Sequence, residues 1–428
     1  MSSEGVIQTA RTASYEADPE QVRRVLLLYS GGLDTSVMLK WIQDEYRAEV
    51  VCLTVNLGQP GEDYAVIEDK ALRLGARECH VVDAREEFAG EYLARAIRAN
   101  GLYGEYPLFT SLGRPLIAKL AVAQARASGC DTIAHGCTGK GNDQVRIEAT
   151  IATLAPELKV IAPVRSWQMG REQEIAYARE HGIPIKSSTG AEGQAPYSID
   201  DNLWGRSSEG RWIEQLEHAP EQDVFQLVTP PELAPQEPGH IQLGFERGLP
   251  VTLDGERLGL VELIERTAAI GARHGVGIVD HIEDRIVGLK VRDIYEAPAA
   301  AIILPAHREL ERLVCTIHQN QFKGGLERQW AYLVYAGLWW EPLREDLDAY
   351  MQSVNEQVTG TIGMRLYKGG ARVVTRSSPN AVYDAGLASF AQSGGLFSQT
   401  ASPGFIELFS LQSRMAWRLR HARDEPRA

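Results

Sequence analysis

Two short stretches of this 428-residue chain hold residue types that could bind phosphate groups and amino acids. The first is a Ser-Gly-Gly-Leu-Asp-Thr-Ser string over residues 30–36, between an apolar run and a stretch with helical spacing of apolar residues. Glycines let the backbone turn close to a bound group, and a helix start offers free N–H groups. The hydroxyl groups suit a polyphosphate, and Asp34 suits its magnesium ion. The string predicts a nucleotide site; an ordinary glycine turn is the plainer alternative.

The second stretch, residues 135–146, reads His-Gly-Cys-Thr-Gly-Lys-Gly-Asn-Asp-Gln-Val-Arg. Asn142 and Asp143 supply an amide and an anion for an α-amino group. Lys140 and Arg146 supply cations for a carboxylate or a phosphate, and the arginine can bind it in a bidentate way. This mixture of polar types predicts a binding site rather than a solvated glycine-rich turn. No histidine is placed by sequence to activate Cys137, which we interpret as an inert thiol.

The elements that must position these stretches alternate between short β-rich runs and longer helical ones. Because such alternation predicts a parallel sheet that binds ligands at the carboxyl ends of its strands, the segments 30–36, 56–59 and 136–146 should meet along one edge. The predicted strands are Val25–Tyr29, Val50–Val55, Glu78–Val82, Thr132–His135 and Val160–Pro163, and the predicted helices are Tyr64–Leu74, Glu86–Ala99 and Pro115–Ser128.

Beyond residue 185 the pattern changes to α+β. A hairpin is predicted from Ile241–Phe245 and Val251–Leu253, with helices over Gly259–His274 and Leu326–Val358. The segment 405–420 places apolar residues on one helical stripe, which favours docking on another subunit or packing within its own chain.

Composition narrows the class of protein. Hydrophobic residues at 44% and charged residues at 24% are typical of a globular protein, and the net charge of -13 argues against a nucleic-acid partner. No apolar run is long enough to cross a membrane, and the polar N-terminus lacks a signal-peptide pattern. The five cysteines lack metal-ligand spacing, so no metal site made by protein ligands alone is predicted, and a cytoplasmic location is expected.

The string over residues 30–36 resembles the PP-loop of the ATP pyrophosphatases, which cut ATP between the α and β phosphates. Residues 29–36 and 136–146 together resemble the argininosuccinate synthase family. The resemblance continues over most of the chain, through residues 106–115, 197–207, 274–277, 282–285, 294–298 and 306–310.

The resemblance implies a cytoplasmic, homotetrameric ligase of arginine synthesis that uses ATP and Mg²⁺ to join citrulline to aspartate, with AMP and pyrophosphate released. Asp34, Ser36, Asp143 and Arg146 would be catalytic. The ATP site would comprise Tyr29, Ser30, Gly31, Gly32, Leu33, Asp34, Thr35, Ser36, Val55 and Gly136. Aspartate would be held by Thr138, Asn142 and Asp143. Citrulline would be held by Tyr106, Ser111, Asn142, Arg146, Ser198, Ser207, Glu283 and Tyr295.

Adenylation of this kind needs positioning and charge stabilisation rather than a protein nucleophile, and no catalytic Ser/His/Asp or Cys/His arrangement is found.

The predicted fold class is therefore α/β: a parallel-sheet PP-loop nucleotide-binding domain, an α+β synthetase domain that binds the substrates, and a C-terminal amphipathic helix. The expected boundaries are a disordered leader over 1–20, the nucleotide-binding domain over 21–185, the synthetase domain over 186–400 and an oligomerisation helix over 401–428.

Three positions in and around the Glu283 stretch depart from the family pattern: Ile278 replaces an arginine, Asp284 an asparagine and Val291 a serine. They leave open a paralogue that adenylates another ureido substrate or uses another amine donor. Elsewhere Val55 stands where a smaller alanine is common, and Gly113 and Leu116 are atypical neighbours of Ser111. An RNA-thiolating PP-loop enzyme would need a basic face and usually paired cysteines, which the sequence lacks. A non-catalytic nucleotide-binding protein would show an eroded phosphate turn, whereas this turn is complete.

Overall fold

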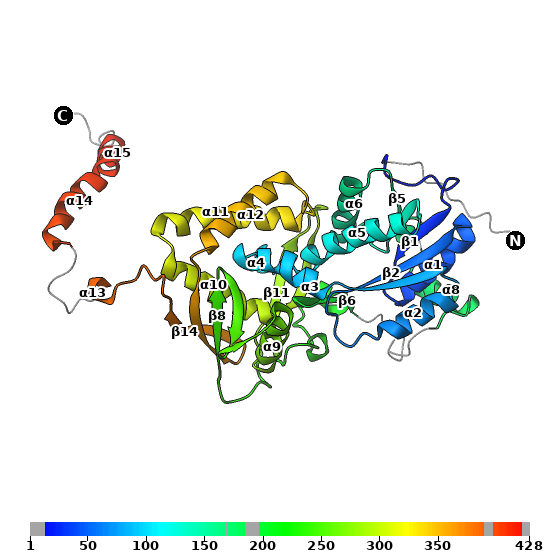
Figure 1. Ribbon diagram of the computed structural model, residues 1–428, viewed down its shortest axis with the longest axis horizontal. Helices are drawn as coiled ribbons and strands as arrows, with labels where there is room; N and C mark the ends of the chain where they lie inside the picture. The colour runs from blue at the N-terminus through cyan, green and yellow to red at the C-terminus, as the bar shows by residue number, and fades with distance from the viewer. Residues whose placement is uncertain (1–12, 168, 185–196, 389–396, 422–428) are drawn as a thin grey trace. The chain divides into compact units, whose positions relative to one another are not determined.

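The computed structural model describes residues 13–167, 169–184, 197–388 and 397–421. The chain divides into two compact units, Met1–Asn380 and Ala381–Ala428. The first unit contains three sheets and the helices that cover them, as Figure 1 shows. Among the described residues, no helix has the length and apolar character that a membrane span requires.

A five-stranded parallel sheet carries the first part of the chain, in the order β3-β2-β1-β4-β5. The strands confirm the sequence prediction to within two residues at either end. Their bounds are β1 Arg24–Leu28, β2 Glu49–Asn56, β3 Glu78–Asp83, β4 Thr132–Ala134 and β5 Lys159–Ile161.

Both faces of this sheet are covered by helices, because the central strands β1 and β2 carry buried apolar residues on both faces. Leu27 of β1 packs in a cluster with Met38 and Ile42 of helix α1 (Leu33–Tyr46). Leu26 belongs to a second cluster with Leu112 of helix α5 (Phe109–Ala127). Such two-sided burial is typical of parallel sheets, and it leaves the carboxyl ends of the strands as the accessible edge.

The remaining helices of this part follow the predicted alternation with changed bounds. The predicted helix 86–99 contains a π-helical turn over Phe88–Leu93 between two short α-helices. Helix α5 begins six residues before its predicted start and contains Pro115. The other helices are α2 Tyr64–Arg73, α3 Arg85–Glu87, α4 Ala94–Arg98, α6 Asp143–Leu154, α7 Pro163–Ser166 and α8 Arg171–Glu180.

The predicted disordered leader is wrong for its last residues. Residues 1–12 lie outside the described part of the chain, but Tyr15 and Ala17 pair with β5: the Val160 N–H donates to the Tyr15 carbonyl and the Ala17 N–H donates to the Val160 carbonyl, both at 3.0 Å. β5 is an edge strand, and its free backbone groups take this segment as a short partner.

The second part of the chain forms two antiparallel sheets. The four-stranded sheet has the order β11-β12-β7-β6, and the five-stranded sheet has the order β10-β9-β8-β13-β14. The predicted hairpin is confirmed as β8 and β9. The strands are β6 Ser198–Asn202, β7 Gly205–Glu209, β8 Gly239–Glu246, β9 Leu249–Leu253, β10 Glu256–Arg257, β11 Ile278–Asp284, β12 Lys290–Glu296, β13 Gly360–Tyr367 and β14 Gly370–Ser377.

One helix prediction for the second part of the chain is wrong. The predicted single helix 326–358 is two helices, because Gly337 adopts φ +78° and Pro342 starts a new helix. The four helices are α9 Leu260–Arg273, α10 Pro298–Val314, α11 Ile317–Tyr335 and α12 Pro342–Asn355, and short 3₁₀ turns cover Arg211–Glu214 and Gln222–Val224.

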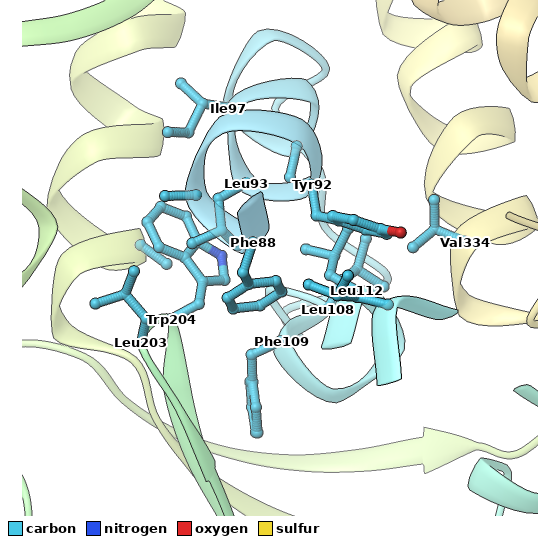
Figure 2. Packing of buried hydrophobic residues seen from close by; sticks show 14 of the residues in the cluster. Phe88, Tyr92, Leu93, Ile97, Leu108, Phe109, Leu112, Leu203, Trp204 and Val334 are labelled. Carbon is cyan, nitrogen blue, oxygen red and sulfur yellow. The ribbon is translucent and has the colours of Figure 1, made fainter. Parts of the chain in front are cut away.

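One hydrophobic cluster runs through both parts of the first unit. Figure 2 shows the place where Phe88, Tyr92 and Phe109 meet Trp204, in the turn between β6 and β7, and Val334 of α11. Because residues so far apart in sequence share this core, the cavities between these elements have fixed walls.

The second unit holds short helical segments: α13 Ala385–Ala388, a 3₁₀ turn Gln399–Ala401, α14 Ser402–Phe409 and α15 Leu411–His421. The single predicted helix 405–420 is thus divided at Ser410. Its large apolar side chains are exposed, including Leu408 at 75% and Phe409 at 78%.

Candidate active site

The turn after β1 is built as a phosphate-binding turn would be. Gly31 adopts φ +74°, and a Cβ there would lie 2.9 Å from Cγ1 of Ile67, so a larger residue fits neither the turn nor the space. Ser30 Oγ lies 3.2 Å from Thr35 Oγ1, and the Ser36 hydroxyl donates to the Gly32 carbonyl at 2.6 Å. Helix α1 starts at Leu33 without a side-chain cap, so its first N–H groups face the turn.

A cavity of about 280 Å³, here called the sheet-edge cavity, opens beside this turn. Tyr29, Ser30, Val55 and Gly136 line it, which brings four of the predicted ATP residues together. The apolar side chains of Leu28, Leu53, Ile67, Ile117, Ile147 and Ile199 also line it, as suits a purine base. Gly31, Gly32, Leu33, Thr35 and Ser36 form the turn itself.

A second cavity of about 300 Å³, here called the polar cavity, lies next to the first. Four residues line both cavities: Arg114, Gly136, Cys137 and Asp200. Among the predicted residues, the polar cavity is lined by Asp34, Tyr106, Gly136, Thr138, Asn142, Asp143, Arg146, Ser198, Ser207, Glu283 and Tyr295. Ser111 is fully buried one helical turn before Arg114. The polar cavity therefore brings together residues that are far apart in the sequence.

Asp143, the first residue of α6, lies between two arginines. Arg114 donates to it from Nε at 2.8 Å and Arg146 from Nη1 at 2.8 Å. Burial opposes its charge, but the two guanidinium groups prevail and lower the pKa of Asp143 to about 2. Asp143 is therefore an anion at neutral pH, as the recognition of an ammonium group requires.

A chain of hydrogen bonds fixes the opposite wall. The Tyr335 hydroxyl donates to Glu283 Oε1 at 2.5 Å and accepts from Asn142 Nδ2 at 2.8 Å. The Tyr295 hydroxyl also donates to Glu283. Burial, together with the Glu283 carboxylate, raises the pKa of both phenols, so they remain donors at neutral pH.

Several buried side-chain polar atoms have no hydrogen-bond partner within the part of the chain that the structure describes, and Ser111 Oγ and Arg146 Nη2 are two of them. Buried polar groups are normally paired, so an unpaired one in a cavity wall, such as that of Arg146, is what a ligand would satisfy. Both belong to the predicted citrulline residues.

The helix that carries Ser111 is held by Tyr106, whose hydroxyl accepts from the backbone N–H groups of Thr110 at 3.0 Å and Ser111 at 3.4 Å. N–H groups in the first turn of a helix have no partner within the helix. The Tyr106 hydroxyl accepts from these two, and the residue at the start of α5, Leu108, has no side chain that could do so. Tyr106 also stacks on Tyr295, with ring centroids 4.6 Å apart. One tyrosine thus ties α5 to the second part of the chain.

Cys137 does not have the features of a nucleophile. Burial and the nearby Asp143 carboxylate raise the pKa of its thiol, so the thiol stays protonated at neutral pH. Its backbone N–H donates to His135 Nδ1 at 3.2 Å, and His135 in turn pairs with Glu148 at 2.9 Å. These contacts hold the 135–146 loop in place.

Comparisons with known proteins show the family to which the chain belongs. A family model described as the arginosuccinate synthase N-terminal HUP domain matches residues 24–184, and one described as the arginosuccinate synthase C-terminal domain matches residues 197–416. The chain is 54% identical over 393 residues to the argininosuccinate synthase of Rubrobacter xylanophilus, covering 92% of this chain and 94% of that protein. The chain belongs to the argininosuccinate synthase family.

Other members of the argininosuccinate synthase family are similar over as much of the chain. The protein from Symbiobacterium thermophilum is 48% identical, covering 92% of this chain and 97% of its own. The protein from Pyrococcus furiosus is 46% identical, with 93% and 95% covered. Among solved structures, the U34-tRNA thiolase NcsA from Methanococcus maripaludis aligns with a TM-score of 0.26 and 16% identity over 43% of this chain and 63% of that chain, which is too weak to carry an argument.

The three departures from the argininosuccinate synthase pattern around Glu283 do not line the polar cavity. Ile278 begins β11, Asp284 forms a surface ion pair with Lys290, and Val291 pairs with Glu283 in the antiparallel register. Among the described residues that line the polar cavity, none is one of these three. Val291 lines only a neighbouring cavity.

Sequence reasoning missed several residues of the site. Arg114, Asp200, Glu209, Arg285 and Asp293 line the polar cavity. Arg114, Asp200 and Arg285 lie inside stretches that resemble the family. A charged residue within such a stretch was the signal that could have identified them. Tyr335 lies outside every such stretch, and only the folded chain brings it to Asn142 and Glu283.

Glu209, Arg285 and Asp293 form a group of charges on one side of the polar cavity. Arg285 Nη2 lies 2.6 Å from Glu209 and 3.4 Å from Asp293. Burial and the nearby Glu209 carboxylate nevertheless raise the pKa of Asp293 to about 7. Asp293 therefore changes charge near neutral pH.

Proposed function

We propose that this protein is a ligase that joins citrulline to aspartate and forms argininosuccinate, AMP and pyrophosphate. The observation that carries the proposal is the pair of adjoining cavities, one mostly apolar beside a phosphate-type turn and one lined by charged groups, with a common wall. A reaction that transfers AMP to an amino acid needs two such compartments in contact.

ATP is assigned to the sheet-edge cavity, with its base among the apolar residues and its phosphates at the turn 30–36. Residues Tyr29 to Ser36 with Val55 and Gly136 would bind it. The start of α1 beside this turn supports the placement of the phosphates, because helix starts favour anions.

The amino acids are assigned to the polar cavity. Thr138, Asn142 and Asp143 would hold aspartate, with Asp143 facing its ammonium group. Citrulline would contact Tyr106, Ser111, Asn142, Arg146, Ser198, Ser207, Glu283 and Tyr295. The unpaired Ser111 Oγ and Arg146 Nη2 support the citrulline assignment.

The chemistry follows in two steps. The ureido oxygen of citrulline attacks the α-phosphorus of ATP; the bond from that phosphorus to the bridging oxygen breaks, and its electron pair leaves with pyrophosphate. The amine of aspartate, as the free base, then attacks the activated ureido carbon and loses one proton to solvent, and the carbon–oxygen bond breaks so that its electron pair leaves with AMP. The protein contributes position and charge to both steps.

A magnesium ion fits this scheme with ligands mainly from the phosphates. Within the described residues, no group of three or more histidine, cysteine, aspartate or glutamate side chains could hold a metal. Asp34 lines the polar cavity next to the turn, and one carboxylate with phosphate oxygens is a usual magnesium environment. The ion would neutralise phosphate charge as pyrophosphate leaves.

We further propose a homotetramer in the cytoplasm. The exposed apolar side chains of α14 and α15 support association, because apolar surface of this kind is normally covered by a partner. Light scattering coupled to gel filtration would give the mass of the assembly.

A pyrophosphate-release assay tests the activity. Purified protein with ATP, Mg²⁺, citrulline and aspartate should produce AMP and pyrophosphate in equal amounts. Relatives of citrulline and other amine donors, offered in its place, test the paralogue alternative. Formation of ADP, or faster turnover with another ureido substrate, would contradict the proposal.

A further inference from the structure

We infer that Arg114 is a catalytic residue of the first step, with its guanidinium group contacting the α-phosphate oxygens while pyrophosphate leaves. This inference rests on the proposed function. Arg114 was not among the residues assigned to ATP or to either amino acid.

The position of Arg114 is the first argument. Its side chain lies in the wall that the sheet-edge cavity and the polar cavity share. If ATP occupies the first cavity and citrulline the second, the ureido oxygen and the α-phosphorus must meet at this wall. Of the four residues common to both cavities, Arg114 alone is a cation, the others being Gly136, Cys137 and Asp200.

The state of its charge is the second argument. Although burial opposes its charge, the Asp143 and Asp200 carboxylates raise the pKa of Arg114 above its usual value. The group is therefore protonated throughout the pH range of an assay. Negative charge moves onto the phosphate oxygens and the leaving pyrophosphate during the step, and a fixed cation in a site of low dielectric stabilises it strongly.

The present partners of Arg114 allow it to turn toward a phosphate. It holds Asp143 through Nε at 2.8 Å and Nη2 at 2.7 Å, and Nη2 also contacts Asp200. Asp143 keeps a second cation, because Arg146 donates to it at 2.8 Å. Asp200, whose pKa is raised by burial, contacts Arg114 only through Nη2. A guanidinium has five N–H donors in a planar fork, which leaves Nη1 for a phosphate oxygen.

The same contacts give Arg114 a way to link the two steps. While it pairs with Asp143, it competes with an ammonium group for that carboxylate. Movement of the guanidinium toward the phosphates would leave Asp143 more available to the aspartate amine. The guanidinium group that stabilises the adenylation step would thereby leave the carboxylate that binds the aspartate amine.

A single-turnover experiment isolates the first step. Enzyme in excess over γ-labelled ATP is mixed with Mg²⁺ and citrulline without aspartate, quenched with acid, and assayed for labelled pyrophosphate. Arg114→Met should slow its formation about 10²- to 10³-fold, the effect of removing one group that stabilises transition-state charge. Arg114→Lys, which keeps the charge but loses the fork, should recover only part of that loss.

Chemical rescue separates catalysis from structure. Millimolar guanidinium should speed Arg114→Ala at least tenfold and leave the wild type unchanged. The matched control is Arg206→Met, which removes another buried arginine paired with an aspartate, Asp201, at 2.5 Å. Arg206→Met should lose stability, without a slow first step that guanidinium rescues.

Three results decide the inference. Pyrophosphate formation by Arg114→Met within threefold of wild type, with only the KM for aspartate raised, would make Arg114 merely a partner of Asp143 and overturn it. If Arg114→Met does not fold, Arg114→Lys decides: a first step at the wild-type rate overturns the inference equally. A wild type that forms no pyrophosphate would refute the proposed function instead.

Discussion

Replacing Tyr335 by phenylalanine removes one oxygen atom that supports two residues of the polar cavity, Glu283 and Asn142. That hydroxyl donates to Glu283 at 2.5 Å and accepts from Asn142 at 2.8 Å. It lines neither cavity, so it acts by positioning two residues that we assign to citrulline. Tyr335→Phe should therefore impair the use of citrulline and spare the binding of ATP.

The magnitude follows from the bond that is lost. A hydrogen bond to a charged group contributes about 1.5–3 kcal/mol, and a buried partner left unpaired loses a similar amount. Because Glu283 keeps its bond from Tyr295, we count only one such loss. Since about 1.4 kcal/mol corresponds to a factor of ten, kcat/KM for citrulline should fall about 10- to 150-fold.

Steady-state pyrophosphate release with each substrate varied in turn measures this effect. The KM for ATP should stay within twofold of wild type. The matched control is Tyr103→Phe: the Tyr103 ring stacks on Tyr335 at 3.7 Å, but its own hydroxyl makes only a 3.3 Å contact to the Asp284 carbonyl. Tyr103→Phe should change kcat/KM less than fivefold. Equal losses for ATP and citrulline, or no loss in Tyr335→Phe, would refute the reasoning.

Four further outcomes are expected. Asp34→Ala should abolish pyrophosphate release with an unchanged melting temperature; undiminished release would remove its role at the metal. Asp143→Ala should raise the KM for aspartate well before that for ATP, and the reverse order in initial-rate assays would refute its placement. Because the pKa of Asp293 rises to about 7 in the folded protein, wild type should lose stability relative to Asp293→Asn as the pH rises from about 4 to 7, with a constant difference above that; denaturant unfolding across this range checks it. Deletion of residues 401–428 should reduce the number of subunits in the assembly, calculated from the mass that light scattering measures. An unchanged number of subunits would contradict the oligomerisation role.

The parallel sheet and its functional edge could be predicted from the sequence because their signals are local. A short apolar strand, a glycine turn and an amphipathic helix are adjacent in the chain, and the rule that parallel strands end at one edge places the segments 30–36 and 136–146 together. The helix break at Gly337 was less visible, because apolar residues with helical spacing continue on both sides of it. The glycine is needed there because a Cβ would lie 2.8 Å from the Arg146 backbone, a contact that exists only in the folded chain.

The sequence indicates which charged residues belong to the site, but it does not indicate which of them form ion pairs. The arginine and aspartates at 114, 143 and 200 belong to stretches that resemble the family, yet nothing in their spacing places one guanidinium between two carboxylates. Tyr335 is 193 residues from Asn142 along the chain. A contact of such sequence separation leaves no local pattern, so it emerges only when α11 packs beside α6.

That separation has a consequence for biosynthesis. During translation the parallel sheet can close once β5 has emerged, whereas Tyr335 follows more than 170 residues later, which at about 5–20 residues per second is a delay on the order of ten seconds or more. The strands and the turn of the parallel sheet are therefore synthesised well before Tyr335, which positions Asn142 and Glu283 beside the polar cavity.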